Sequence, residues 1–248
     1  MDWVERLFDG PFGESLKQTE EDQERTRREV EFITRELGLG PADQVLDLAC
    51  GYGRHALEIS AGVAGIVGVD RTAAFIERAR QLADERGLGN ARFEVADMRA
   101  LDYSAEFDAA YNYFTSWGYY DEQANFDVLR RVARALKPGG RFLMEMIGRD
   151  SLMRRYRARS WEQADEDTIV LMENHFDVAT GLQHNTRTYL RPGAAPEVIE
   201  IRHYIPAPDH LARLLREAGF AETRIVSAPD GGEPTIDSFR IAVIGTAP

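Results

Sequence analysis

The segment VLDLACGYGRH, Val45 to His55, constrains the fold of this chain more than any other feature. It begins as an apolar β-strand and passes through an acid into a turn that contains two glycines. Glycine adopts backbone angles that other residues avoid and lets a ligand approach the main chain closely. In an open α/β sheet the binding crevice lies at the carboxyl ends of the strands, where Asp47 is expected. The segment therefore predicts a strand, a turn and a helix that bind a ligand.

A second acid indicates what kind of ligand this is. Residues Gly65 to Val69 predict another buried strand, and Asp70 ends it. An acid at the end of the second strand typically accepts hydrogen bonds from ribose hydroxyls. Asp70 also fits a purely structural role, as the cap of a helix that begins near Thr72. Together with Asp47, it favours a ligand that contains a nucleoside.

Strands and helices alternate from Gln44 to Met146 and again at the end of the chain. Strands are expected at residues 44–48, 64–69, 91–95, 107–112, 140–146, 222–226 and 238–244, and helices at 52–60, 72–86, 122–136 and 210–218. This alternation implies parallel crossovers with helices on both faces. The predicted fold class is α/β, with a doubly wound, mostly parallel, seven-stranded sheet.

Two regions depart from this pattern. Three β-leaning segments between residues 160 and 204 predict an inserted antiparallel meander, which either caps the substrate pocket or forms a subunit interface. A helix is expected at Thr19 to Leu37, after an aromatic-rich arm that contains Trp3, Leu7, Phe8 and Phe12. The arm either packs on the core or closes over the ligand as a lid.

We therefore predict three parts in the chain. Residues 1–40 form the N-terminal helical arm, residues 41–150 and 205–248 form the ligand-binding domain, and residues 151–204 form the inserted β region.

Composition argues against several classes of partner. The net charge of −12 opposes binding to nucleic acid, which relies on clustered Lys and Arg. No apolar run approaches the roughly 18 residues that span a bilayer, and the first residues are charged rather than signal-like. We expect no nucleic-acid or membrane partner and a cytoplasmic location. Cys50 is the only cysteine, which excludes an intramolecular disulfide and a multi-cysteine metal cluster, and no metal is expected.

Five segments occur in an order that is specific when they are taken together. They are VLDLACGYGRH, GIVGVD at 65–70, FEVADMRAL at 93–101, FDAAYNYFTSWGYYD at 107–121 and LKPGGRFLMEM at 136–146. This series resembles the class I S-adenosylmethionine-dependent methyltransferases. It is most similar to small bacterial members with F-T-S-[FW]-G-Y after the fourth strand, some of which methylate amines in the biosynthesis of natural products such as antibiotics. The resemblance implies a Rossmann-like fold, S-adenosylmethionine as the cofactor, and methyl transfer to a nitrogen or an oxygen of a small molecule.

The resemblance also assigns the cofactor contacts. Asp47 and the turn after it would meet the methionine portion, and Asp70 the ribose. Arg71 and Met98 would lie against the adenine, and Asp97 would accept a hydrogen bond from the exocyclic amine of the adenine. The implied cofactor residues are Asp47, Ala49, Cys50, Gly51, Gly53, Asp70, Arg71, Asp97, Met98 and Asn112.

Candidate catalytic residues lie beyond the fourth strand and in the meander. The resemblance implies that Tyr113 lies beside the transferred methyl, and Phe114 would lie next to it where the substrate enters. Aromatic rings attract cations by about 0.5 to 2 kcal/mol, which would suit an amine acceptor and the sulfonium. His203 is a candidate base that would titrate near neutrality, with a solvent-facing strand histidine as the alternative.

Two other functions remain open from the residues alone. Gly51, Gly53 and Ala56 satisfy a relaxed dinucleotide pattern, which fits an NAD-dependent oxidoreductase. A non-catalytic scaffold with a methyltransferase-like fold is the other alternative. The expected partner is a small-molecule methyl acceptor, and a homo-oligomer stays open.

Overall fold

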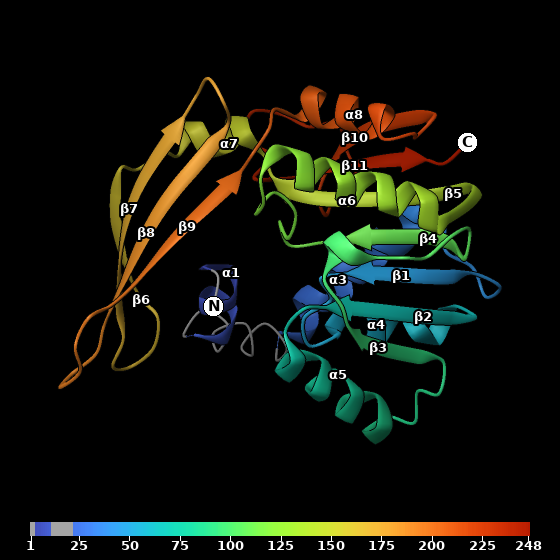
Figure 1. The fold of residues 1–248 in the computed structure, drawn as a ribbon, viewed down its shortest axis with the longest axis horizontal. Coiled ribbons are helices and arrows are strands. Elements are labelled where there is room, and N and C mark those ends of the chain that lie inside the picture. The colour runs from blue at the N-terminus through green and yellow to red at the C-terminus, as the bar shows by residue number, and fades with distance from the viewer. Residues whose placement is uncertain (1–2, 11–21) are drawn as a thin grey trace.

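The computed structural model describes residues 3–10 and 22–248, which fold around two β-sheets (Figure 1). Phe12 of the expected arm and the first residues of the helix expected from Thr19 lie outside these ranges. No helix within them is long and apolar enough to cross a membrane.

The larger sheet has seven strands in the order β10-β11-β5-β4-β1-β2-β3. Their bounds are β1 Gln44–Leu48, β2 Gly65–Asp70, β3 Ala91–Val95, β4 Phe107–Asn112, β5 Leu136–Ile147, β10 Glu222–Ser227 and β11 Arg240–Thr246. The strands β1 to β5 pair in parallel, whereas β11 pairs antiparallel with both β5 and β10. The chain runs from β1 outward to β3 and then returns to β4 on the other side of β1. A doubly wound sheet binds its ligand at this switch point, and the predicted fold class is confirmed.

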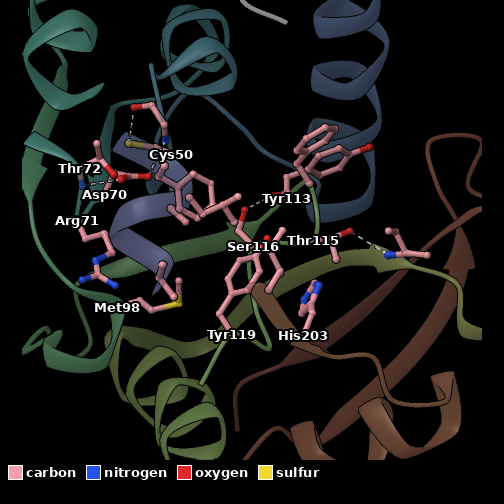
Figure 2. Close-up of a pocket in the computed structure, with 18 of the residues that line it drawn as sticks. Cys50, Asp70, Arg71, Thr72, Met98, Tyr113, Thr115, Ser116, Tyr119 and His203 are labelled. Carbon is pink, nitrogen blue, oxygen red and sulfur yellow. Dashed lines mark hydrogen bonds between the residues drawn. The ribbon is translucent and has the colours of Figure 1, made fainter. Parts of the chain in front are cut away.

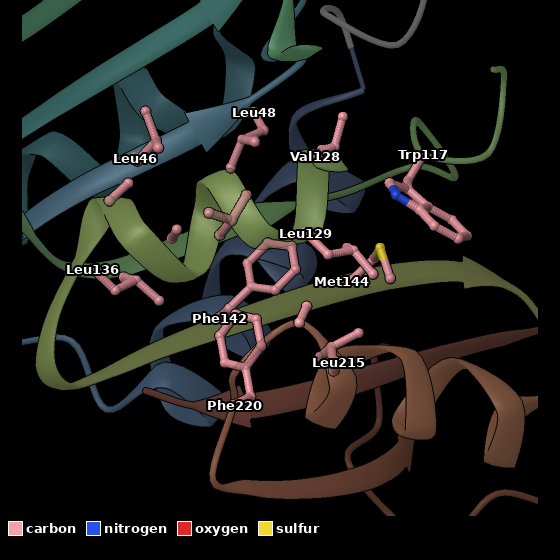
Figure 3. Packing of buried hydrophobic residues seen from close by; sticks show 14 of the residues in the cluster. Leu46, Leu48, Trp117, Val128, Leu129, Leu136, Phe142, Met144, Leu215 and Phe220 are labelled. Atoms are coloured by element: carbon pink, nitrogen blue, oxygen red, sulfur yellow. The ribbon is translucent and has the colours of Figure 1, made fainter. Parts of the chain in front are cut away.

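Helices cover both faces of this sheet. They are α3 Gln23–Leu37, α4 Arg54–Ile59, α5 Ala73–Glu85, α6 Glu122–Ala135 and α8 Pro208–Glu217. Neighbouring residues of β1 point to opposite faces: Val45 packs in the cluster of α3, α4 and α5, and Leu46 in the cluster of α6 and α8. Figure 3 shows the second cluster, where Phe142 of β5 stacks on Phe220 with ring centroids 5.7 Å apart. The strands are therefore apolar on both faces of the sheet, as expected for a parallel sheet that helices cover on both sides.

The smaller sheet is antiparallel, in the order β6-β7-β8-β9. Its strands are β6 Arg159–Gln163, β7 Ile169–Asp177, β8 Leu182–Leu190 and β9 Glu197–Tyr204, and the short helix α7 Arg149–Arg154 precedes them. The three expected meander strands are confirmed, but β6 and α7 were not predicted. The sequence of β6, RSWEQ, is mostly polar and exposed, so it lacks the alternation that reveals a strand.

The helix α1, Trp3–Asp9, packs on the inner face of the smaller sheet. Its Leu7 is buried with Val170, Tyr189, Ile199 and Ile201. Figure 1 shows α1 between this sheet and the carboxyl ends of the larger one. The structure thus brings the arm and the meander to the same edge of the main sheet. The division of the chain into three domains stays a prediction.

Candidate active site

A cavity of about 550 Å³ lies between the carboxyl ends of the larger sheet, α1 and the inner face of the smaller sheet (Figure 2). Its wall includes Asp47 and Asp70 from one side and Asn185 and His203 from the other. A volume of this size is typical of sites for small ligands. The cavity therefore joins the region expected to bind the cofactor to a wall built by the meander.

The turn after β1 forms the floor of the first half. Ala49, Gly51 and Gly53 all have φ between 56° and 76°, in the left-handed region. A side chain added to Gly51 would meet no atom within 4 Å, so this part of the turn is open to a ligand. Gly53 does not border the cavity; a Cβ there would lie 2.6 Å from the ring of Phe93. Gly53 therefore allows the start of α4 to pack closely against β3.

Cys50 borders the cavity within this turn, but its chemistry is that of a packed thiol. A Cβ added at Gly68 would lie 2.9 Å from the Cys50 sulfur and closer still to the ring of Phe93, so the sulfur packs tightly against β2. Burial raises the pKa of the Cys50 thiol well above its usual value, and the charges of Asp47 and Asp70 raise it further. The thiolate that a nucleophile requires is thereby disfavoured.

Asp47 is 2% exposed and accepts a hydrogen bond from the hydroxyl of Tyr111 at 2.8 Å. Burial raises the pKa of Asp47 to about 8, the hydrogen bond from Tyr111 and the charge of Arg54 oppose this rise, and the carboxylate of Asp70 adds to it. A buried acid with a raised pKa is suited to a cationic ligand, which stabilises its ionised form.

Asp70 combines both roles considered for it. Its carboxylate accepts the N–H of Gly51 at 3.0 Å and the N–H of Thr72 at 2.8 Å, so it ties the turn to the start of α5. It also borders the cavity, and burial raises its pKa while these N–H groups lower it. The Thr72 side chain also hydrogen-bonds to this carboxylate, and the lone pairs that remain can accept a hydrogen bond from a ligand hydroxyl.

Asp97 lies elsewhere. Its carboxylate accepts the N–H of Arg99 at 2.9 Å and pairs with the Arg99 guanidinium at 2.6 Å. It borders a smaller depression that adjoins the main cavity, since Arg71, Thr72 and Ala96 line both, and Met98 lines the main cavity alone. The three acids follow neighbouring strands as expected, but only Asp47 and Asp70 face the same cavity.

Asn112 at the end of β4 is buried and does not line the cavity. Its amide nitrogen donates to the carbonyl of Leu48 at 2.9 Å, which ties β4 to β1. Its amide oxygen has no hydrogen-bond partner within residues 3–10 and 22–248.

Tyr113 and Phe114 lie in the cavity wall beyond β4. Phe114 and Thr115 have φ of 67° and 57°, which is rare for residues with side chains. The Phe114 ring lies 4.8 Å from the guanidinium of Arg25 and 4.5 Å from that of Arg240. The protein's own cations therefore already contact this ring.

His203 faces the cavity and is 8% exposed, so the solvent-facing alternative is wrong. Its Nε2 lies 2.7 Å from the carbonyl oxygen of Trp117, and its ring stacks on Tyr119 with centroids 4.5 Å apart. Because a carbonyl only accepts, Nε2 carries the proton and Nδ1 is an acceptor. Burial lowers the pKa of His203 to about 4, not the near-neutral value expected, so the ring is neutral at pH 7.

A buried charge cluster beside the turn was missed by sequence reasoning. Glu29 of α3 pairs with Arg54 at 2.5 Å, His55 at 2.9 Å and Arg25 at 3.0 Å. Burial alone would raise the pKa of Glu29, but the hydrogen bond from His55 and the charge of Arg54 lower it to about 2. Burial and Arg54 lower the pKa of His55 to about 4. In the sequence Glu29 is one charge within a charged helix, so no local signal marks it.

A row of polar side chains on the smaller sheet was also missed. Asn174 accepts from the amides of Asn185 at 2.8 Å and Gln183 at 3.2 Å, and Arg187 donates to Asn185 at 2.9 Å. All four line the cavity. In the sequence these residues read as the solvent side of the strands, because polar side chains usually face water.

Parts of the sequence match known methyltransferases. A family model described as "Methyltransferase domain" matches residues 45–140. The rRNA methyltransferase RlmD of Xylella fastidiosa, named for uracil(1939)-C(5) of 23S rRNA, is 47% identical over 62 residues, which cover 25% of this chain and 14% of that protein. An uncharacterized methyltransferase of Bacillus subtilis, YcgJ, is 34% identical over 102 residues, 41% of this chain and 39% of that protein. The chain thus matches well under half the length of these curated relatives.

Solved structures share the fold over most of the chain. The CcbJ methyltransferase from Streptomyces caelestis has a TM-score of 0.76 at 17% identity and covers 90% of both chains. The sugar N-methyltransferase KedS8 from Streptoalloteichus has a TM-score of 0.65 at 21% identity, covering 90% of this chain and 87% of its own. CalS10 from Micromonospora echinaspora, an amino pentose methyltransferase involved in calicheamicin biosynthesis and solved with S-adenosylmethionine bound, scores 0.64 at 16% identity over 91% of each chain. Residues 45–140 therefore match a methyltransferase domain, and the chain as a whole shares the fold of these solved methyltransferases.

Proposed function

We propose that this protein transfers a methyl group from S-adenosylmethionine to a nitrogen, or alternatively an oxygen, of a small molecule. The observation that carries the proposal is the continuity of one cavity, which runs from Asp47 and Asp70 to the inner face of the smaller sheet. Such a cavity holds a donor and an acceptor side by side, as a direct transfer requires.

The residues present fit this cofactor. Gly51 leaves open space where a ligand can approach the main chain, and two buried acids border that space. Asp47 would bind the ammonium of the methionine portion and Asp70 the ribose hydroxyls, with Arg71 and Met98 beside the adenine. Asp97 could contribute only through lone pairs that its pairing with Arg99 leaves available.

The cofactor supplies an electrophilic methyl group on a sulfonium. The chain's part is to align the acceptor and exclude water, and alignment is worth roughly 7 to 11 kcal/mol in favourable models. We place Tyr113 and Phe114 at the junction of the two halves of the cavity. Neutral His203 presents Nδ1 as a hydrogen-bond acceptor for an N–H or O–H nucleophile. With a pKa of about 4 it is a weak base, so we expect it to orient the nucleophile more than to deprotonate it.

Several observations favour a small acceptor. The smaller sheet and α1 bound the cavity on the side opposite the cofactor turn, and the net charge of −12 opposes nucleic acid. The match to the rRNA methyltransferase covers only 62 residues, whereas the fold likeness to KedS8 and CalS10 extends over nine-tenths of the chain. A role in natural-product biosynthesis and a cytoplasmic location stay part of the proposal.

Calorimetry with S-adenosylmethionine and with NAD tests the cofactor, and we expect binding of the first alone. Transfer of a radiolabelled methyl is then measured on a panel of amines, amino sugars and phenols, with ribosomal RNA as a further acceptor. Label in a small molecule supports the proposal. Label in RNA alone would favour an RNA methyltransferase, and binding of NAD alone would favour an oxidoreductase. Binding of S-adenosylmethionine with no transfer to any acceptor would favour the non-catalytic scaffold.

A further inference from the structure

Glu145 of β5 is fully buried, with an exposed fraction of 0%, and it lies behind the cavity wall rather than in it. One carboxylate oxygen accepts the N–H of Phe114 at 2.6 Å, and the other accepts the guanidinium of Arg240 at 2.6 Å. Burial raises the pKa of Glu145, while the charge of Arg240 and these hydrogen bonds lower it. A buried acid with two such partners is not needed to fill space, because apolar residues of similar size fill a core as well.

We propose that Glu145 is a positioning residue that fixes Phe114 in the wall of the cavity, through the Phe114 N–H and through Arg240. The placement in the cavity rests on the structure alone, and its effect on methyl transfer rests on the proposed function.

The backbone at this point needs support. Phe114 and Thr115 both have positive φ, and for a β-branched residue such as Thr115 this is strongly disfavoured. Such a conformation persists only where the surroundings over-determine it. Glu145 contacts both residues, since its own carbonyl accepts the N–H of Thr115 at 3.2 Å. The hydroxyl of Thr115 in turn accepts the N–H of Ile147 at 3.0 Å (Figure 2).

The ring of Phe114 is positioned by the same ion pair. The guanidinium of Arg240 lies 4.5 Å from the ring centroid while it bonds to Glu145. Phe114, Thr115 and Arg240 all line the cavity. One buried carboxylate therefore controls both the backbone and the ring environment of a residue at the junction of the two halves.

The variant Glu145→Gln breaks this arrangement with little change in shape. Both partners of Glu145 are donors, and glutamine offers one acceptor oxygen and one NH₂ group. Either Phe114 or Arg240 must lose its acceptor. The matched control is Asp108→Asn: Asp108 also accepts a backbone N–H, that of Gln44 at 2.8 Å, and pairs with Lys137 at 2.8 Å, but it does not border the cavity.

Two measurements test the proposal. Hydrogen–deuterium exchange of a peptide over residues 112–118 should speed up on the order of tenfold in Glu145→Gln and stay unchanged in Asp108→Asn. The kcat for methyl transfer should fall about 10- to 100-fold in Glu145→Gln, with cofactor Kd within about threefold, and stay unchanged in the control. The double variant Phe114→Ala/Glu145→Gln should have a kcat less than about twofold below that of Phe114→Ala alone, because the ring that Glu145 positions is already absent.

The proposal would be overturned if hydrogen–deuterium exchange over residues 112–118 is unchanged in Glu145→Gln. It would also be overturned if the fold losses of kcat in Phe114→Ala and Glu145→Gln multiply in the double variant. If Glu145→Gln does not fold, Arg240→Lys takes its place: a lysine keeps the charge but not the planar fork that reaches both the acid and the ring, so kcat should fall with Kd retained. An equal kcat in Arg240→Lys would contradict the proposal. If the unmodified protein transfers no methyl, the proposed function fails, and the exchange experiment still decides whether Glu145 holds Phe114.

Discussion

The two walls of the cavity are built in different ways. The wall proposed to bind the cofactor, here called the cofactor wall, contains a main-chain turn with positive φ at Gly51 and acids at strand ends such as Asp70. The wall proposed to bind the acceptor, here called the acceptor wall, is made of side chains from α1 and from the inner face of the smaller sheet, such as Leu7 and Asn185. A turn with positive φ requires glycines at set positions in the sequence, and these positions can be recognised. A wall made of side chains requires no such sequence pattern. The comparison implies that changes in one wall should affect cofactor binding and changes in the other should affect turnover.

The largest expected effect is on the cofactor wall. Asp70→Ala should weaken S-adenosylmethionine binding by roughly 1.5 to 3 kcal/mol, about 10- to 150-fold in Kd, because it removes a hydrogen bond to a charged group. Calorimetry measures this, with the melting temperature as a control, since Asp70 also accepts the N–H groups of Gly51 and Thr72. Asp70→Asn keeps one acceptor oxygen and should lose less. An unchanged Kd in a folded Asp70→Ala variant would remove this residue from the site.

A change at the junction of the two walls should affect kcat rather than the Kd of the cofactor. Phe114→Ala should lower kcat about 10- to 100-fold, since misplacing the reacting groups by about 1 Å is enough for such a loss. Cofactor Kd should change less than about twofold. Steady-state kinetics and calorimetry on the same preparation separate the two quantities. A large change in Kd with kcat preserved would place Phe114 on the cofactor wall instead.

Proton release on cofactor binding sharpens the assignment of Asp47. Its pKa of about 8 means that it is mostly protonated at pH 7 when no ligand is bound, whereas an ammonium favours the ionised form. Cofactor binding should therefore release up to one proton, and affinity should rise up to about tenfold from pH 6 to pH 7. Calorimetry at pH 7 in buffers of different ionisation enthalpy measures the release.

Asp47→Asn supplies the control for this measurement, since it should release no proton at this site. A binding enthalpy that is independent of the buffer in the unmodified protein would contradict the assignment. The pH dependence of folding has the opposite sign to that of binding. Because the folded-state pKa of Asp47 is raised above its usual value, this residue stabilises the unliganded fold below about pH 4, and that contribution is lost as the pH rises through about 8.

The difference between the walls also explains how far the sequence could be interpreted. The seven strands and the acids at 47 and 70 follow from periodicity and from motif spacing, which depend on the local chain. The pairing of Asp97 with Arg99 and the burial of Asn112 depend on side-chain rotamers, which motif spacing does not specify. The cluster around Glu29 joins residues that are far apart in the sequence, and the amide row at Asn185 looks like a solvent-facing strand surface. Contacts of this kind appear only when the whole fold is assembled.

The smallest effect is expected outside both walls. Trp161 is 67% exposed and lies on the outer face of the smaller sheet, in a cross-strand row with Leu171, Thr188 and Val198. If the sheet serves only to cap the cavity, Trp161→Ser should leave kcat unchanged and alter stability by less than about 0.5 kcal/mol, as exposed substitutions usually do. Sedimentation and thermal unfolding, compared at low and high protein concentration, measure this. A lower mass for the variant than for the unmodified protein would show instead that this face pairs with a second copy, and the sheet would then be both wall and interface.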